Sequence, residues 1–142
     1  MRISVVSFQK SRSPQLEEAE GDYVRRLSRH AQLELVRIRD AGQDGLPQRL
    51  LGSTYRIGLF VDGTTLTSEE MAARLQYLMG RGHSHLVLVI GGPEGMPARA
   101  GAQVHERWSL SRLTFSHQLC RLVLLEALYR SFDILSGGRY HK

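Results

Sequence analysis

The sequence predicts an α/β fold, in which a mostly parallel sheet is flanked by helices. Short apolar or β-branched runs alternate along the chain with longer segments of helical periodicity, and this alternation is typical of parallel sheets. Two runs, Arg56–Val61 and His85–Ile90, are largely apolar, as expected for strands covered on both faces. A length of 142 residues, 42% of them hydrophobic, fits one domain over residues 1–142.

The first part of the chain contains two predicted strands and one long predicted helix. Arg2–Phe8 is rich in β-branched residues and indicates a strand. Pro14–His30 begins with proline, carries glutamates early and arginines late, and is therefore expected to be helical. Leu33–Arg39 alternates apolar and polar residues, which favours a half-buried strand. Asp40–Pro47 is expected to be a loop, with a short helix over Gln48–Ser53.

The second part adds two strands and two helices. The strand Arg56–Val61 is expected to end at the turn Asp62-Gly63. Thr67–Met79 has a hydroxyl at its start and carboxylates in its first turn, which predicts a helix there. After the strand His85–Ile90, the segment Gln118–Phe132 is apolar on most sides. We therefore expect this last segment to form a helix that is buried or lies at a subunit interface.

The chain is basic, with 19 Lys and Arg against 14 Asp and Glu and a formal net charge of +5. Arginine binds phosphate bidentately and stacks on bases, so this balance favours an RNA partner. A basic surface without a nucleic-acid role is equally compatible with the charge. Glu126 and Arg130 stand four residues apart in a helical segment, which suits either a local ion pair or a solvated stripe.

The sequence also indicates the cellular compartment of the protein. Cys120 is its single cysteine, which excludes an internal disulfide and favours a reducing, cytoplasmic environment. Its apolar neighbours indicate a core position. No apolar run approaches the roughly 20 residues of a membrane-spanning helix, and Met1 to Phe8 lacks a signal-peptide pattern. We therefore expect a cytoplasmic protein without a membrane partner.

A glycine-rich loop follows the second apolar strand. Gly91, Gly92 and Gly95 surround Pro93 and Glu94, at the carboxyl end of a parallel strand, where ligands bind in open α/β sheets. Glycines let backbone approach a ligand closely. A tight turn without a ligand remains compatible with this motif. The spacing of a dinucleotide fingerprint or a P-loop is absent.

A second segment, Ser109–His117, places four hydroxyl side chains just before the last helix. Such a segment can present backbone amides and carbonyls to an adenine edge, while Leu110, Leu113 and Phe115 pack around it. It is also compatible with a capped helix start that binds nothing.

The last four residues form a third candidate element. Arg139, Tyr140, His141 and Lys142 offer an aromatic platform, an imidazole and two cations, a set that suits a base and its phosphate. A disordered chain end is the alternative. His83 has no cysteines or carboxylates at zinc-ligand spacing around it, so no metal site is expected.

Together these motifs resemble those of the ribosomal RNA large-subunit methyltransferase H family, a small branch of the SPOUT (α/β-knot) methyltransferases. The motifs are an Ile-Gly-Gly-Pro-Glu-Gly loop, a Ser-Leu-Ser-x-x-Thr-x-x-His segment, a Glu-x-x-Tyr-Arg helix and a Tyr-His-basic end. They stand here at Ile90 to Gly95, Ser109 to His117, Glu126 to Arg130, and Tyr140 to Lys142. The similarity runs nearly from end to end of the chain.

The resemblance implies a single SPOUT domain with a C-terminal trefoil knot, an exception to the near absence of knots. It implies S-adenosylmethionine as cofactor, a homodimer whose site is completed across the interface, and methylation at N3 of a pseudouridine in large-subunit ribosomal RNA on the assembled ribosome. The implied cofactor contacts are Leu59, Gly91, Gly92, Gly95, Leu110, Ser111, Arg112, Leu113, Thr114 and Phe115.

The resemblance also implies roles for the chain end. Tyr140 and His141 would face the target base, and His141 is hypothesised to assist loss of the N3 proton or to orient the base. A second hypothesis assigns phosphate binding to four cations, which are Arg25, Arg26, Arg139 and Lys142.

The sequence departs from the family pattern in three places and leaves two other functions open. The family usually has proline where Arg139 stands and an acidic residue where Phe60 follows the third-strand leucine, and the loop at residues 42–46 is short. A related knot methyltransferase acting on a tRNA ribose hydroxyl would share the cofactor motifs. A non-catalytic ribosome-binding factor would share the scaffold and would not need S-adenosylmethionine, which calorimetry can test.

Overall fold

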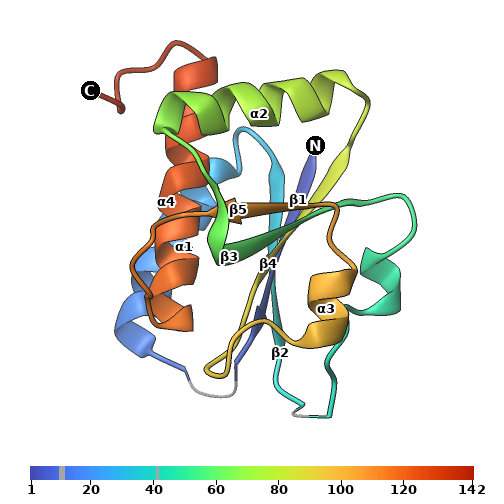
Figure 1. Cartoon of the computed structure of the whole chain (residues 1–142). Coiled ribbons are helices and arrows are strands. Elements are labelled where there is room, and N and C mark those ends of the chain that lie inside the picture. The colour runs from blue at the N-terminus through green and yellow to red at the C-terminus, as the bar shows by residue number, and fades with distance from the viewer. Residues whose placement is uncertain (10–11, 41) are drawn as a thin grey trace.

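The computed structural model describes residues 1–9, 12–40 and 42–142 (Figure 1). Five strands form one sheet in the order β2-β1-β4-β3-β5, and every neighbouring pair is parallel. The strands are β1 Arg2–Phe8, β2 Gln32–Ile38, β3 Tyr55–Thr65, β4 His85–Ile90 and β5 Glu106–Ser109. The predicted α/β fold with a parallel sheet is therefore confirmed.

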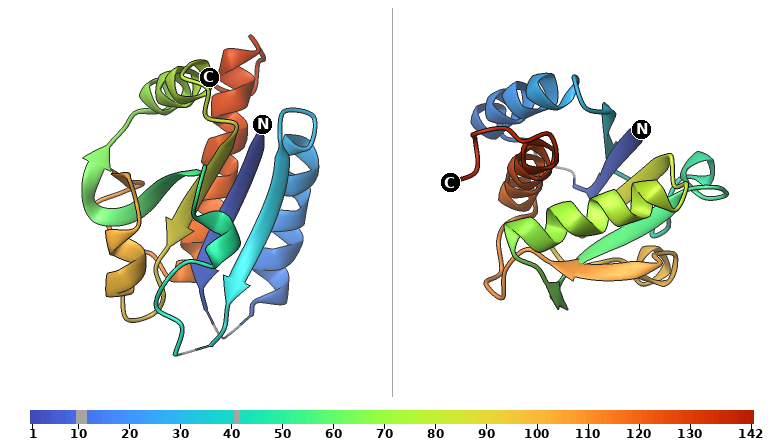
Figure 2. Two further views of the ribbon diagram at one scale, coloured as in Figure 1. Left: turned by 90° about the vertical axis from the view of Figure 1, so that its right-hand side faces the viewer. Right: turned by 90° about the horizontal axis from the view of Figure 1, so that it is seen from above.

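Helices cover both faces of this sheet (Figures 1 and 2). One face is covered by the three longer helices, which are α1 Pro14–Leu27, α2 Ser68–Gly80 and α4 His117–Leu135. The other face is covered by the 46–51 segment with its short 3₁₀ helix η1 (Gln48–Leu50) and by α3 (Ala98–Ala102). Among the described residues, no helix is long and apolar enough to cross a membrane.

The alternation of side chains along the central strands creates a core on each face of the sheet. In β1, Ile3 and Val5 pack against the long helices, whereas Val6 and Phe8 pack against the opposite layer. Strand β4 divides in the same way between the two cores. This two-sided burial explains why β4 reads as a continuous apolar run.

Local signals set the helix ends. Helix α1 begins at Pro14, as predicted, and ends at Leu27, three residues before the predicted end. Helix α2 begins with a capping box: Thr67 Oγ1 accepts a hydrogen bond from the Glu70 amide at 3.1 Å, and Glu70 Oε1 accepts one from the Thr67 amide at 2.8 Å. Two otherwise unpaired backbone groups are thereby satisfied.

Strand β3 is longer than predicted, because it continues through the expected turn at Asp62-Gly63. Its pairing with β5 shifts register between Leu59 and Thr64, which identifies a bulge. A Cβ at Gly63 would lie 2.6 Å from the carbonyl carbon of Trp108, so glycine here permits close approach of the β5 backbone. Neither β5 nor α3 was predicted, because both are short and neither has a clear hydrophobic period.

Helix α4 connects the region of the glycine turn with the end of the chain. It begins at His117 beside the glycine turn and ends at Leu135, just before the chain end (Figure 1). Its 19 residues span about 28 Å at 1.5 Å per residue. Segments at its two ends are therefore far apart within one chain.

Candidate functional site

A cavity of about 500 Å³ lies at the carboxyl end of β4 and beside the middle of β3, where the pairing of these two strands ends at Leu59 and Ile90. The glycine turn forms one wall and the segment at residues 110–116 forms the other. Nine of the ten residues expected to contact a cofactor line this cavity: Leu59, Gly91, Gly92, Gly95, Leu110, Ser111, Leu113, Thr114 and Phe115. The tenth, Arg112, is exposed and is not among the lining residues.

The glycine turn is shaped by its own packing. Gly92 and Gly95 exchange backbone hydrogen bonds of 3.0 and 2.9 Å, and Gly95 has a φ of 95°, which favours glycine. A Cβ at Gly91 would lie 2.8 Å from the backbone of Gly95, and one at Gly92 would lie 2.5 Å from the Phe8 carbonyl oxygen. Because Gly91 and Gly92 lack side chains, their backbone packs directly against Gly95 and Phe8. The same lack of side chains permits close approach of a ligand.

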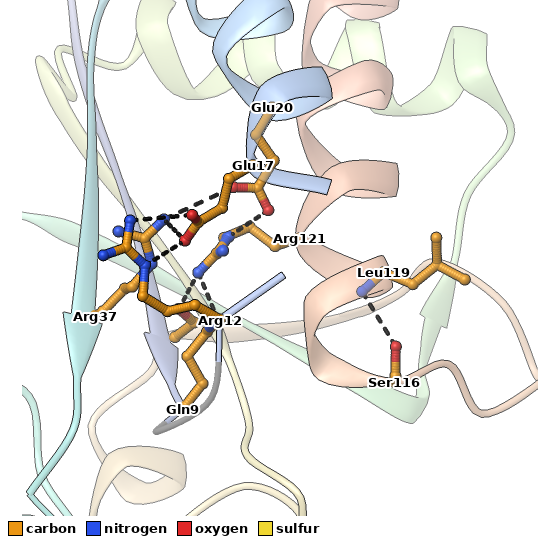
Figure 3. Close-up of polar contacts among 9 residues, drawn as sticks. Gln9, Arg12, Glu17, Glu20, Arg37, Ser116, Leu119 and Arg121 are labelled. Carbon is orange, nitrogen blue, oxygen red and sulfur yellow. Dashed lines mark hydrogen bonds and ion pairs between the residues drawn. The ribbon is translucent and has the colours of Figure 1, made fainter. Parts of the chain in front are cut away.

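Hydroxyl groups hold the second wall in place. Ser109 Oγ lies 2.9 Å from the carbonyl oxygens of both Val61 and Ser111. The Leu113 amide donates to Ser111 Oγ at 3.0 Å. Ser116 caps α4, because its Oγ accepts a hydrogen bond from the Leu119 amide at 3.2 Å (Figure 3). The hydroxyls therefore both shape the loop and cap the helix. A capped helix start and a ligand-binding loop, the two interpretations of this segment, are thus compatible.

Two lining residues that sequence reasoning did not assign to the site come from the first turn of α4. His117 Nε2 is buried without a hydrogen-bond partner among the described residues. Burial, and then the charge of Arg121, lowers the pKa of His117, so this ring is neutral at pH 7. Burial raises the pKa of the Cys120 thiol to about 11, so Cys120 is not a thiolate nucleophile.

The lining of the cavity is consequently neutral. The described residues that form it are apolar side chains, glycine and proline backbone, hydroxyls, one imidazole and one thiol. A volume of about 500 Å³ falls in the range of small-molecule sites. The cavity suits a small ligand with a flat, apolar part and a few hydrogen-bonding groups at its edges.

A buried polar network fixes the start of α4 behind this cavity (Figure 3). The Arg121 side chain is 1% exposed. It donates through Nε to Glu20 Oε1 at 2.8 Å and through Nη1 to Ser7 Oγ at 2.9 Å and to Gln9 Oε1 at 2.5 Å. The network joins α4 to α1 and to the carboxyl end of β1. It therefore holds the helical turn that presents His117 to the cavity.

The end of the chain is packed onto its own helices. The Tyr140 amide donates to Asp133 Oδ2 at 2.9 Å, and the Tyr140 hydroxyl lies 3.2 Å from that of Tyr23 and 3.3 Å from Glu126 Oε2. Asp133 also closes the preceding turn, because its carbonyl accepts from the Gly138 amide at 2.8 Å. These contacts order the segment without the proline that the family usually has at position 139.

His141 is held between two helices. Its Nδ1 lies 3.0 Å from Arg130 Nη1 on α4, and its Nε2 lies 2.7 Å from Glu69 Oε1 on α2. Of the two interpretations left open for Glu126 and Arg130, the structure shows the local ion pair, with contacts of 3.1 and 2.9 Å. Neither Tyr140 nor His141 lines the cavity of its own chain, because both contact the C-terminal half of α4, whereas the cavity is lined by the first turn of this helix.

Two of the four predicted phosphate-binding cations, Arg25 and Arg26, lie on α1, and Arg26 packs beside the aromatic rings at this chain end. The Arg26 guanidinium lies over the rings of Tyr23 and Tyr129, at 5.4 and 5.7 Å from their centroids, and the Tyr129 and Tyr140 rings are 4.8 Å apart. Arg25 and Arg26 each pair with Asp22, at 3.3 and 3.2 Å. The other two cations, Arg139 and Lys142, are exposed on the chain end itself. The structure thus gathers basic and aromatic groups around Tyr140.

Within the described ranges of the chain, no three His, Cys, Asp or Glu side chains are grouped so that they could hold a metal ion.

Comparison with known proteins yields a family and several relatives. The family model described as "Predicted SPOUT methyltransferase" matches residues 1–141. The chain is 36% identical over 159 aligned positions to the ribosomal RNA large subunit methyltransferase H of Acetivibrio thermocellus. It is 34% identical over 159 positions to the protein of that name from Clostridioides difficile, and 34% identical over 162 positions to that from Lysinibacillus sphaericus. Each alignment covers 100% of both proteins.

Proposed function

The chain belongs to the ribosomal RNA large subunit methyltransferase H family of SPOUT methyltransferases, and on this basis we propose its substrate, cofactor and assembly. The proposed reaction is methylation of N3 of a pseudouridine in large-subunit ribosomal RNA, on the assembled ribosome and with S-adenosylmethionine as methyl donor. The observation that carries the proposal is the neutral cavity beside the glycine turn. The proposed location is the cytoplasm, where ribosomes are found.

The cavity fits S-adenosylmethionine by the chemistry of its lining. Leu59, Leu110 and Phe115 would pack against the faces of an adenine ring, and backbone groups of the 110–116 segment would bind its edge. His117 Nε2 has no hydrogen-bond partner in the described part of the chain, so it is available to a polar group of the cofactor. When bound, S-adenosylmethionine supplies a methyl group on a positively charged sulfur, which a neutral cavity accommodates without repulsion between like charges.

A second copy of the chain would complete the proposed site. Tyr140 and His141 contact α4 at Glu126 and Arg130, which lie about 14 and 20 Å along the helix from His117 at the cavity. Three large apolar side chains around the cavity are also exposed: Val61 at 48%, Leu113 at 71% and Leu119 at 40%. Exposed apolar groups that cluster in this way mark an interface. A homodimer would cover them and bring the chain end of one copy to the cavity of the other.

The family fold further suggests that the chain forms a trefoil knot. Strand β5 lies at the edge of the sheet beside β3, whereas α4, the next element, packs against α1 and α2. The 110–116 segment must therefore return from the sheet edge to the centre of the helical layer, next to the glycine turn. A knot would fix this segment against the turn, and both are walls of the cavity.

The chain end supplies the groups that the reaction needs beyond the cavity. Pseudouridine N3 carries a proton that must leave before or during methylation, and the His141 imidazole is proposed to accept it. The Tyr140 ring offers a stacking surface for a base. The proposed phosphate ligands are Arg25, Arg26 and the exposed cations Arg139 and Lys142, of which Arg26 lies over the Tyr129 ring beside Tyr140. Positioning of the base against the methyl group would then supply most of the rate gain.

Transfer of a labelled methyl group tests the proposal directly. Purified protein is incubated with tritiated S-adenosylmethionine and one of three acceptors: ribosomes that lack the modification, free ribosomal RNA, or bulk tRNA. The position of the label is then mapped by mass spectrometry. We expect label on a large-subunit pseudouridine, with ribosomes preferred over free RNA. Label on tRNA ribose would contradict the proposed substrate, although the protein would still be a methyltransferase. Cofactor binding without any label would point to a non-catalytic ribosome-binding factor.

A further inference from the structure

The contacts of His141 determine which of its ring nitrogens carries the proton. Arginine has only hydrogen-bond donors, so His141 Nδ1, 3.0 Å from Arg130 Nη1, must accept through its lone pair. The neutral ring then carries its proton on Nε2, which donates to Glu69 Oε1 at 2.7 Å. Two partners on two different helices therefore select the same tautomer.

We propose that Glu69 is a positioning residue, which holds His141 as the Nε2–H tautomer so that Nδ1 receives the proton from the substrate. This inference rests on the proposed function. In the proton transfer, the N3–H bond of the pseudouridine breaks and its electron pair stays on N3, which becomes the nucleophile. Nδ1 gains the proton, and the resulting imidazolium still donates its Nε2 proton to Glu69. A carboxylate at the second nitrogen orients the ring and stabilises the charge that forms.

Arg130 occupies the place that the substrate proton would take. Its Nη1 points at the Nδ1 lone pair, while Nε and Nη2 bind both oxygens of Glu126. Nδ1 becomes available when Nη1 turns away from the imidazole, for example toward a phosphate. The charged groups that face His141 are thus Glu69 from α2, with Arg130 and Glu126 from α4.

The state of Glu69 agrees with this role. Its hydrogen bond with His141, followed by a bond from its own backbone amide, holds the pKa of this carboxyl below its ordinary value. Glu69 also lies in the first turn of α2, where the helix dipole favours a negative charge. The group therefore remains an ionised acceptor throughout the pH range in which a histidine titrates.

Glu69→Gln and Glu69→Asp test the inference, with Glu70→Gln as a matched control. The control removes the same charge one residue away and leaves a capping box that glutamine can complete. At saturating cofactor and ribosomes, we expect Glu69→Gln to lower kcat by at least about tenfold and to move the acid limb of the kcat–pH profile to lower pH. The KM for S-adenosylmethionine should not change, because Glu69 does not line the cavity. Glu69→Asp should recover part of the rate.

A second readout does not depend on methyl transfer. Long-range ¹⁵N–¹H spectra of the histidine rings report the tautomer, and the His141 signals are identified by their loss in His141→Gln. We expect the Nε2–H tautomer in the wild type and in Glu70→Gln, and a mixture of tautomers in Glu69→Gln.

The outcomes separate this inference from the proposed function. An active wild type whose Glu69→Gln variant matches Glu70→Gln at every pH would overturn the role of Glu69 alone. An Nδ1–H tautomer in the wild type would do the same. A wild type that methylates no RNA would overturn the proposed function, and the proton-transfer role with it.

Discussion

Arg121 on α4 and Glu20 on α1 form a buried ion pair, with 2.8 Å between Nε and Oε1 and both side chains 1% exposed. Removal of one partner of such a pair leaves an uncompensated charge in the interior and typically costs about 3–5 kcal/mol. We predict a loss of this size in the free energy of unfolding for Arg121→Met, measured by urea denaturation. Arg121 also binds Ser7 and Gln9 and so holds the turn of α4 that presents His117 to the cavity. The affinity for S-adenosylmethionine should therefore fall as well.

The double variant Arg121→Met with Glu20→Leu supplies the control for this prediction. It removes both charges, so it should be less destabilised than Arg121→Met alone. If the double variant lost as much free energy of unfolding as the two single variants together, the interaction between the two charges would contribute nothing to stability.

Gly91→Ala should damage the cavity. The added Cβ would lie 2.8 Å from the Gly95 backbone, and overpacking of this kind costs about 1–3 kcal/mol. Since the turn is a wall of the cavity, we expect calorimetry to find S-adenosylmethionine bound at least about tenfold more weakly. Gly80→Ala at the end of α2, where a Cβ meets nothing within 4 Å, should bind normally. Equal affinities in the two variants would contradict the assigned site.

Three described histidines make stability depend on pH. Burial is the first cause that lowers the pKa values of His85, His105 and His117. The unfolded chain binds protons more readily at these sites, so the free energy of unfolding falls as pH drops through the ordinary imidazole value of about 6.5. Urea denaturation should therefore find lower stability at pH 5.5 than at pH 7.5. The decrease should be smaller in His117→Gln, and an unchanged decrease would rule out a neutral, buried His117.

The cations near the chain end should govern the electrostatic part of ribosome binding. Replacement of Arg139 or Lys142 by alanine should weaken RNA binding and lower its salt dependence by about one released counterion each. Arg49 of η1 lies on the opposite layer and pairs with Glu34, so Arg49→Ala should keep the wild-type salt dependence. Filter binding of large-subunit RNA at several salt concentrations measures both quantities. If the slope of log affinity against log salt concentration were unaltered in the chain-end variants, these residues would be excluded as phosphate ligands.

The parallel sheet and the two loops that form the walls of the cavity could be predicted from local sequence pattern, whereas the individual cofactor contacts, such as Leu59, were implied by the family resemblance. The pairing of the apolar strands β3 and β4 ends at Leu59 and Ile90, and the turn at residues 91–95 follows directly. Boundaries were less predictable. The bulge in β3 depends on Gly63 meeting the Trp108 backbone, a contact between segments that are distant in sequence.

The polar groups that support the site were not predictable from spacing. Arg121 stands in an apolar helix, and its partners Glu20, Ser7 and Gln9 come from two other elements. Glu69 and His141 are 72 positions apart. Only the tertiary fold brings such groups together, and no periodicity in the chain marks them.

A heterodimer of two inactive variants tests most directly whether the site is shared between two copies. Gly91→Ala, with a damaged cavity, and His141→Ala, with a damaged chain end, are co-expressed with different tags, and the mixed dimer is purified through both tags. Each homodimer should transfer almost no methyl groups to ribosomes. The mixed dimer joins one intact cavity to one intact chain end, so about half of the wild-type activity should return. A mixed dimer as inactive as its parents would contradict a site completed by the partner copy.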